Sequence, residues 1–228
     1  MGYTGAMAAL DSSAVPALTK EDAELSALVE KICAQLEVDH GRGFRALTEC
    51  LRQGYTFFFP ALRRLAQEGT VANRQALVRA LAEAVDPSDP FRAGFLLEIL
   101  SPMLWDPSPE VRRLARRALR ERFVTVHPEE TLELLVQWAA EPDPARKALS
   151  AQMLGHLPVK QAKRALIALK QLARSEEREV RRAVLAALRR LRAQAAQVVQ
   201  GELARWQEDP ELAPLVRRVL DSQELPQR

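Results

Sequence analysis

NRQAL at residues 73–77 returns along the chain as VRRLA at 111–115, ARKAL at 145–149, VRRAV at 180–184 and VRRVL at 216–220. The first residues of successive stretches are 38, 34, 35 and 36 positions apart. A period of this length is typical of stacked helical hairpins, because one hairpin cannot bury its apolar face alone and needs neighbours. The pattern therefore predicts an all-α chain, folded as a right-handed α–α superhelix of about five to six helical hairpins.

The composition agrees with a helical repeat. Of 228 residues, 47% are hydrophobic but only 5% are aromatic, so Leu, Ala and Val must carry the packing. These residues favour closely packed helices, and no useful length of sequence shows the alternation of a strand. We expect one solenoid domain over residues 19–222, with a flexible lead-in (1–18) before it and a polar tail (223–228) after it. The opening stretch 1–7 looks in part like a non-native remnant, with Met7 as a candidate native start, and the sequence leaves open whether these residues are native.

Several classes of protein are disfavoured by what the sequence lacks. Cys33 and Cys50 lie in helical patterns and are expected to be small buried hydrophobes, not a disulfide scaffold. No run of 18 apolar residues and no secretory signal is present, so we expect a cytoplasmic protein without a membrane span. No Gly-rich phosphate loop, CxxC, HExxH or GxSxG motif occurs. We therefore expect no cofactor, no metal and no small-molecule substrate, and the sequence favours a chain that is not an enzyme.

Glycine and proline predict where the helices begin and end. Gly54 is expected to end a helix, and the next is expected to start near Thr56, carry Pro60 in its first turn and end at Gly69. The sequence DPSP at 106–109 predicts a tight connector, with Ser108 as the N-cap and Pro109 in the first helical position.

The aromatic residues divide into two groups. Trp105, Trp138 and Trp206 each lie in an apolar helical context and are expected in the core. Residues 57–59 are three consecutive phenylalanines, which point in three directions on a helix. The run is therefore either a partner contact or simple burial beneath the first helices.

Two connector segments carry a resemblance to a known family. DPSPEVR at 106–112 resembles the signature of HEAT repeats, in which an Asp in the turn lies five residues before an apolar–Arg pair. SEEREVR at 175–181 looks like the same unit without the Asp, and the resemblance covers roughly residues 70–222. The resemblance implies an α-solenoid, and many such proteins are adaptors while some bind nucleic acid.

A fainter similarity points to one enzymatic branch of that family. HPEETLELLVQW at 127–138 is similar to segments of HEAT-like bacterial alkylpurine DNA glycosylases. That resemblance implies a catalytic carboxylate paired with aromatic residues, for which Trp105 and Asp106 are the nearest counterpart. Asp106, however, occupies the connector position that HEAT repeats use structurally, and no second Trp–carboxylate element is found.

Charge is distributed unevenly along the chain. The net charge is only +3, yet residues 151–200 hold 11 basic and 3 acidic residues, whereas residues 1–50 hold 4 basic and 8 acidic ones. A polarised charge distribution predicts a surface directed at an anionic partner.

Arginines at helical spacing are the best candidates for that surface. Arg112, Arg116 and Arg120 are four residues apart and share one helix face. A second set occurs two repeats later. The candidate partner-binding residues are Arg112, Arg113, Arg116, Arg117, Arg120, Arg182, Arg189 and Arg190.

Two alternatives compete with binding. In one, the first arginine of each pair (Arg112, Arg146, Arg181) bonds to the turn Asp or Glu of a neighbouring repeat. In the other, the later arginines are a solvated helix face. Our leading hypothesis is a non-catalytic scaffold or adaptor that binds an acidic protein surface through a basic concave face. The alternative is a DNA- or RNA-binding protein, in the extreme an alkylpurine DNA glycosylase-like repair factor.

Overall fold

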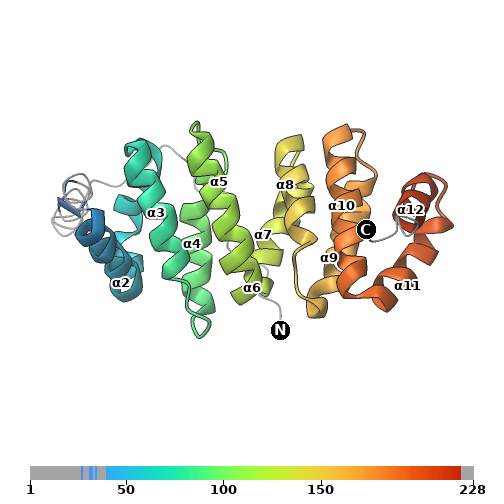
Figure 1. Cartoon of the computed structure of the whole chain (residues 1–228), viewed down its shortest axis with the longest axis horizontal. Coiled ribbons are helices and arrows are strands. Elements are labelled where there is room, and N and C mark those ends of the chain that lie inside the picture. The colour runs from blue at the N-terminus through green and yellow to red at the C-terminus, as the bar shows by residue number, and fades with distance from the viewer. Residues whose placement is uncertain (1–26, 28–30, 33, 35–39, 222–228) are drawn as a thin grey trace, which may run out of the picture.

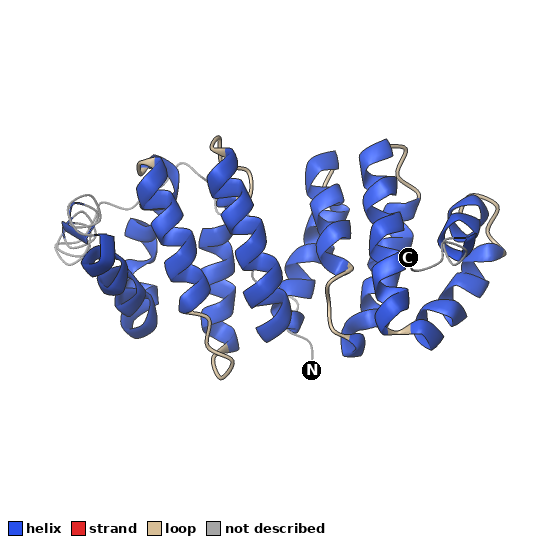
Figure 2. Cartoon of the chain, viewed as in Figure 1, coloured by secondary structure: helices blue, strands red, loops and turns tan. Residues whose placement is uncertain are grey.

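The computed structural model describes residues 27, 31, 32, 34 and 40–221, with the side chains of 40 and 53–57 left out. In these residues the regular structure is entirely helical (Figure 2). The main helices are α2 (His40–Glu68), α3 (Val71–Glu83), α4 (Pro90–Met103), α5 (Pro109–Ala118), α6 (Val124–Val126), α7 (Pro128–Ala140), α8 (Pro144–Leu154), α9 (Ala162–Ala173), α10 (Arg178–Gln194), α11 (Ala196–Gln207) and α12 (Ala213–Leu220). The predicted lead-in and tail lie outside the described residues.

The helices pair into hairpins that stack side by side (Figure 1). The described part of the chain holds the pairs α2–α3, α4–α5, α7–α8, α9–α10 and α11–α12. The helices α3, α5, α8 and α10 stand in one layer, here called the second-helix layer, with α4, α7 and α9 behind them. In the second-helix layer, α3 packs against α5 and α8 against α10, and α10 also contacts α12 beyond it. The predicted α–α superhelix of helical hairpins is confirmed.

Each repeat stretch contributes one buried stripe to a single core. In α5 the stripe is Val111, Ala115 and Ala118, at the spacing of a helix face. Trp138 and Trp206 are 2% and 1% exposed, as predicted. None of the helices that the structure describes is both long and apolar enough to span a lipid bilayer.

Gly155 lets two second helices approach closely. A Cβ atom at Gly155 would lie 2.7 Å from the Cα and 2.9 Å from the Cβ of Ala187, on α10. Real Cβ atoms do not sit this close to neighbouring atoms, so the α8–α10 junction requires a glycine here. The junction between α8 and α10 is therefore closed by backbone contact.

The prediction that Gly54 ends a helix is wrong. The helix α2 runs unbroken from His40 to Glu68 and carries Pro60 in its interior. Buried leucines lie on both sides of the proline, with Leu51 and Leu62 both fully buried. Tertiary packing of both halves outweighs the local cost of a mid-helix proline, about 3 kcal/mol. The end near Gly69 is confirmed.

The connectors use proline and aspartate largely as predicted. Pro109 occupies the first turn of α5, and Ser108 is its N-cap by position. The Ser108 hydroxyl, however, donates to Glu110 (2.7 Å) and does not accept from the helix backbone. Asp143 does cap α8, since its carboxylate accepts from the Ala145 N–H at 2.9 Å.

One buried ion pair joins two successive repeats. Arg74 on α3 donates to Asp106, in the connector before α5, at 2.6 Å and 3.0 Å, and it also bonds the Gly69 carbonyl. Its side chain is 13% exposed and that of Asp106 is 4% exposed. Asp106 therefore has a structural role between repeats.

The prediction that Arg112, Arg146 and Arg181 bind a neighbouring repeat is wrong. Arg112 donates to two carbonyls of its own connector, Asp106 O at 2.5 Å and Pro107 O at 2.9 Å. Arg181 likewise bonds Ser175 O at 3.1 Å, and Arg146 bonds Glu141 at 2.6 Å. All three guanidinium groups hold the turn that precedes their own helix, because that turn is within reach of the first helical residues.

Candidate binding groove

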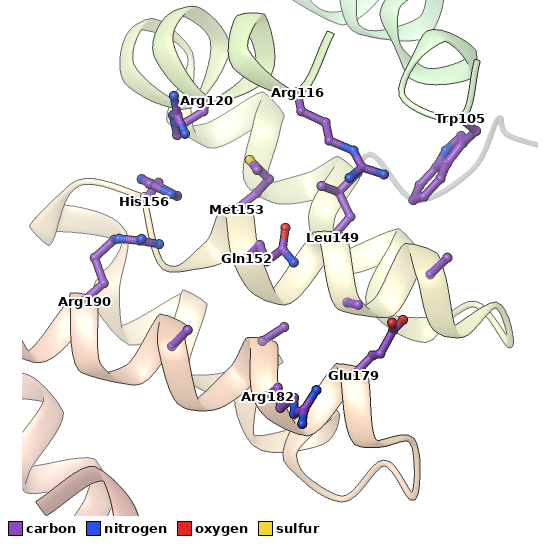
Figure 3. Close-up of a pocket in the computed structure, with 14 residues that line it drawn as sticks. Trp105, Arg116, Arg120, Leu149, Gln152, Met153, His156, Glu179, Arg182 and Arg190 are labelled. Atoms are coloured by element: carbon purple, nitrogen blue, oxygen red, sulfur yellow. The ribbon is translucent and has the colours of Figure 1, made fainter. Parts of the chain in front are cut away.

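The second-helix layer opens into a groove bordered by α5, α8 and α10 (Figure 3). We call it the central groove; its volume is about 750 Å³. Small and apolar side chains form much of its lining: Ala145, Ala148, Leu149, Met153, Ala183 and Ala186. Gln152, which is exposed, adds an amide to the same surface.

Four of the eight candidate arginines line this groove. Arg116 and Arg120 come from α5 and the π-helical turn that continues it (Leu119–Phe123), and they share a face because they are four residues apart. Arg182 and Arg190 come from α10, where eight residues span about two turns and return to the same face. The helix periodicity of two repeats thus brings these side chains to one groove. Glu179 is the one carboxylate among its described lining residues.

The groove arginines differ in how far they are already paired. Arg120 contacts Glu121 at 2.8 Å, and Arg117 contacts the same carboxylate at 2.7 Å. Within the described residues, Arg182 and Arg190 form no hydrogen bond or ion pair. These two guanidinium groups therefore keep their full hydrogen-bonding capacity for a ligand.

Arg116 lies over an indole ring at one end of the groove. Its Cζ is 5.8 Å from the centre of the Trp105 ring, and Trp105 in turn meets Trp138 edge to face at 6.4 Å. The Nε atom of Arg116 and the Nε1 atom of Trp105 are buried without a hydrogen-bond partner among the described residues. Trp105 was expected in the core; it packs against the core on one side and lines the groove on the other.

A histidine lies between two of these arginines. Figure 3 shows His156, just after α8, flanked by Arg120 and Arg190. Partial burial, together with the charges of Arg190 and Arg120, lowers the pKa of His156 from its ordinary value of 6.5 to about 4. His156 is therefore neutral near pH 7 and leaves the positive charge of the groove to the arginines.

The other four candidate arginines lie outside the groove lining. Arg112 holds its own connector, Arg117 pairs with Glu121, and Arg189 donates to the Arg218 carbonyl at 3.2 Å. Arg113 is exposed on α5. Their role in partner binding stays a prediction.

A second groove adjoins the first along the same layer. This C-terminal groove, about 570 Å³, lies between α10 and α12 and shares Arg182 with the central groove. Its other charged lining residues are Arg178, Arg181, Arg218 and Glu211.

The residues that the sequence offered for catalysis do not meet in either groove. Asp106 is 5% exposed, is held by Arg74 and does not line the central groove. No group of three or more His, Cys, Asp or Glu in the described part of the chain is arranged to hold a metal ion. Cys33 lies outside the described residues. Cys50 is half-buried against the core, and burial followed by the charge of Glu49 raises the pKa of its thiol.

The structure describes the side chains of two of the three consecutive phenylalanines at 57–59. Phe58 and Phe59 are partly buried against the core, and the side chain of Phe57 lies outside the described residues. Phe59 contacts Phe95 edge to face at 5.5 Å. The exposed aromatic of this region is Phe91, 69% exposed, which the sequence pattern did not single out.

Sequence reasoning missed Trp105, Gln152 and His156 as groove residues. For two of them the sequence held a signal, namely their position on the helix. Leu149, Gln152, Met153 and His156 recur at three- and four-residue steps on or just after α8 and so share one helix face. That face would have been expected to lie between the arginine faces of the flanking repeats.

Comparisons with known proteins agree with this architecture. Residues 93–189 match the family model for HEAT repeats. The chain is similar to a solved structure described as "Crescerin uses a TOG domain array to regulate microtubules in the primary cilium", with a TM-score of 0.63 and 14% identity, covering 87% of this chain and 91% of that one. It also matches a designed armadillo repeat protein in complex with the peptide (KR)4, with a TM-score of 0.39 and 15% identity over 87% of this chain and 99% of that one, a likeness too weak to bear on function. No curated protein matches the sequence.

The α-solenoid fold expected from the connectors is confirmed, and the HEAT-repeat resemblance is confirmed over residues 93–189. The fold is a scaffold of a kind that typically binds proteins along an extended surface. The fainter similarity to DNA glycosylases stays a prediction.

Proposed function

We propose that this protein is a non-catalytic scaffold that binds an acidic protein surface through the central groove. One observation carries the proposal: four arginines from two repeats line one groove that has a single described carboxylate, and two of them have no partner. Like charges held together without counter-charges repel one another, so the groove favours a ligand that supplies acids. We place this activity in the cytoplasm.

The chemistry of the groove suits a carboxylate ligand on a protein. A guanidinium group presents a planar fork that binds a carboxylate through two parallel hydrogen bonds. The alanines, Leu149 and Met153 provide apolar contact area beside that fork. A groove of this kind anchors acidic side chains and buries the apolar groups next to them.

The proposal is tested by charge reversal with a matched control. A double variant, Arg182→Glu with Arg190→Glu, should lose the proteins that the immobilised wild-type chain captures from a lysate of its source cells. Lys163→Glu changes a charge on α9, in the other helix layer, and should leave capture intact. Equal capture by the double variant and the wild type would remove the central groove as the binding surface.

Nucleic acid is the second candidate, because arginine forks bind phosphate as well as carboxylate. Binding to phosphates releases counterions, so affinity for duplex DNA would fall steeply with salt. Fluorescence anisotropy with labelled duplex DNA at two ionic strengths tests this candidate. Absence of binding at low salt would eliminate it, and an excision assay on N-alkylated purines would separate a repair enzyme from a scaffold.

A further inference from the structure

The two grooves share a wall and one arginine. Helix α10 separates them, and Arg182 lines both the central and the C-terminal groove. A ligand that lies in one groove and continues past Arg182 therefore enters the other. Because the helices of the second-helix layer stand side by side, such a ligand crosses them instead of running along one of them.

The C-terminal groove repeats the charge pattern of the central one. Four arginines line it against one described carboxylate, Glu211. Arg178 has no hydrogen bond or ion pair among the described residues, as for Arg182. Over both grooves, seven arginines face two glutamates, the additional three being Arg178, Arg181 and Arg218.

Apolar surface lies beside the arginines in both grooves. The C-terminal groove is lined by Ala173, Leu185, Pro214 and Leu215, the counterpart of the alanines and Leu149 in the central groove. Both linings thus combine cationic side chains with small or aliphatic ones. An extended peptide has the complementary pattern, since successive side chains point to opposite sides.

We propose that the two grooves form one track, which binds an extended acidic segment of a partner protein across α5, α8, α10 and α12. Carboxylates of the segment pair with the arginines, and its alternate residues pack on the apolar lining. This inference rests on the proposed function of the central groove and adds the form, charge and length of what binds there.

Three features favour a peptide over a nucleic-acid strand. Single strands bind along series of aromatic stacking platforms, whereas Trp105 is the one Phe, Tyr or Trp among the described lining of both grooves. Glu179 and Glu211 would repel a continuous line of phosphates but accept hydrogen bonds from peptide N–H groups. Gln152 offers an amide donor and acceptor in the central groove, which matches a peptide backbone.

The track also sets the length of the segment. Packed helices lie about 8–10 Å apart, so the two packed steps from α8 to α12 and the wider opening between α5 and α8 together span at least roughly 30 Å. An extended chain rises about 3.3 Å per residue, so about nine residues fill the track. A segment of half that length reaches only one groove.

The test uses fluorescein-labelled peptides of alternating Glu and Ala, of about six and about twelve residues, in anisotropy titrations with the full chain. The longer peptide should bind about tenfold more tightly, because both grooves hold it at once. Arg178→Glu should weaken the long peptide about tenfold and the short one much less, because the short peptide can still occupy the central groove. Arg190→Glu should weaken both, and Lys163→Glu neither. Circular dichroism of each variant checks that the helices are retained.

Results on peptide length, peptide charge and nucleic-acid binding can each contradict the proposal that the two grooves form one track. Equal affinity for both lengths, or an unchanged long-peptide affinity in Arg178→Glu, would mean that only the central groove binds, and the proposed function would survive. Equal binding of an alternating Gln–Ala peptide would show that carboxylates are not recognised. Tighter binding of a twelve-nucleotide dT strand than of the long peptide would favour the nucleic-acid reading instead.

Discussion

Arginine has opposite surroundings in two neighbouring parts of the second-helix layer. These parts are the junction between α3 and α5 and the opening between α5 and α8. At the first, Arg74 is 13% exposed and is bound by the buried carboxylate of Asp106. At the second, Arg116 and Arg120 line a groove, and no described carboxylate of α8 faces them in its lining. An arginine in a repeat is therefore either bound within the fold or left lining a groove, according to whether the next repeat supplies an acid.

Helix packing in the second-helix layer is also uneven. Between two of the helices that border the central groove, Gly155 brings α8 against α10 so closely that no Cβ fits. The closed α3–α5 and α8–α10 junctions hold in place the helices that border the groove. Fixed helices also fix the backbone positions of the arginines, which lowers the cost of ordering the groove in a complex.

The largest effect should come from breaking the closed junction at Arg74. Arg74→Ala leaves Asp106 buried without its counter-charge, and removal of one partner of a buried pair costs about 3 kcal/mol or more. The midpoint of thermal unfolding should fall by roughly 10 °C, measured by circular dichroism. Arg205→Ala is the control: this arginine is 73% exposed, pairs with Glu202, and should change stability by less than about 1 kcal/mol. Equal shifts in the two variants would show that Arg74 does not join the repeats.

A smaller effect should come from the glycine that closes α8 against α10. Gly155→Ala introduces a clash with Ala187 and should lower the free energy of unfolding by about 1–3 kcal/mol. Gly201→Ala makes the same substitution inside α11, where a Cβ meets nothing within 4 Å. That variant should instead gain about 0.5–1 kcal/mol from helix propensity. Urea denaturation measures both, and a gain at both positions would contradict the close approach.

The histidine of the open groove gives the smallest and most local prediction. Because the pKa of His156 is about 4 in the folded chain and 6.5 ordinarily, the unfolded chain binds more protons at this site between those values. Stability from this site is therefore complete above pH 6.5 and is lost as the pH falls through about 4. His156→Gln should remove that part of the pH dependence in urea denaturation.

Arg190→Gln separates the two causes of that shift. Loss of one of the neighbouring charges should raise the pKa of His156, followed by NMR of its ring protons. Addition of the acidic peptide should raise it further, because carboxylates near the ring favour its charged form. An unchanged pKa in both experiments would place His156 away from the charges of the groove.

The architecture could be predicted because the buried positions recur with the period of the sequence repeat. The positions of Val111 and Val180 in their stretches predicted their burial, and the DPSP segment predicted the start of α5. The continuity of α2 through Gly54 and Pro60 could not be predicted, since local propensity favours a break there and only tertiary packing overrides it.

The site was predictable in part. Helix periodicity placed Arg116 and Arg120 on one face, and both line the groove. Periodicity alone could not predict that Arg116 and Arg120 line the groove while Arg113 and Arg117 do not. The helix face that a neighbouring repeat covers depends on how the two repeats are packed, and the sequence spacing does not determine this. Arg74 bonds both its own connector and the buried Asp106 of the next one, whereas Arg112, at the equivalent position, bonds its own connector.

The most direct measurement compares stability and binding in a single variant, Arg182→Glu. If the groove arginines serve a partner and the junction arginines serve the fold, its unfolding midpoint stays within a degree or two of the wild type while its affinity for the twelve-residue acidic peptide falls at least tenfold. A fall in the midpoint as large as that of Arg74→Ala, or an unchanged affinity, would show that the two classes of arginine do not differ.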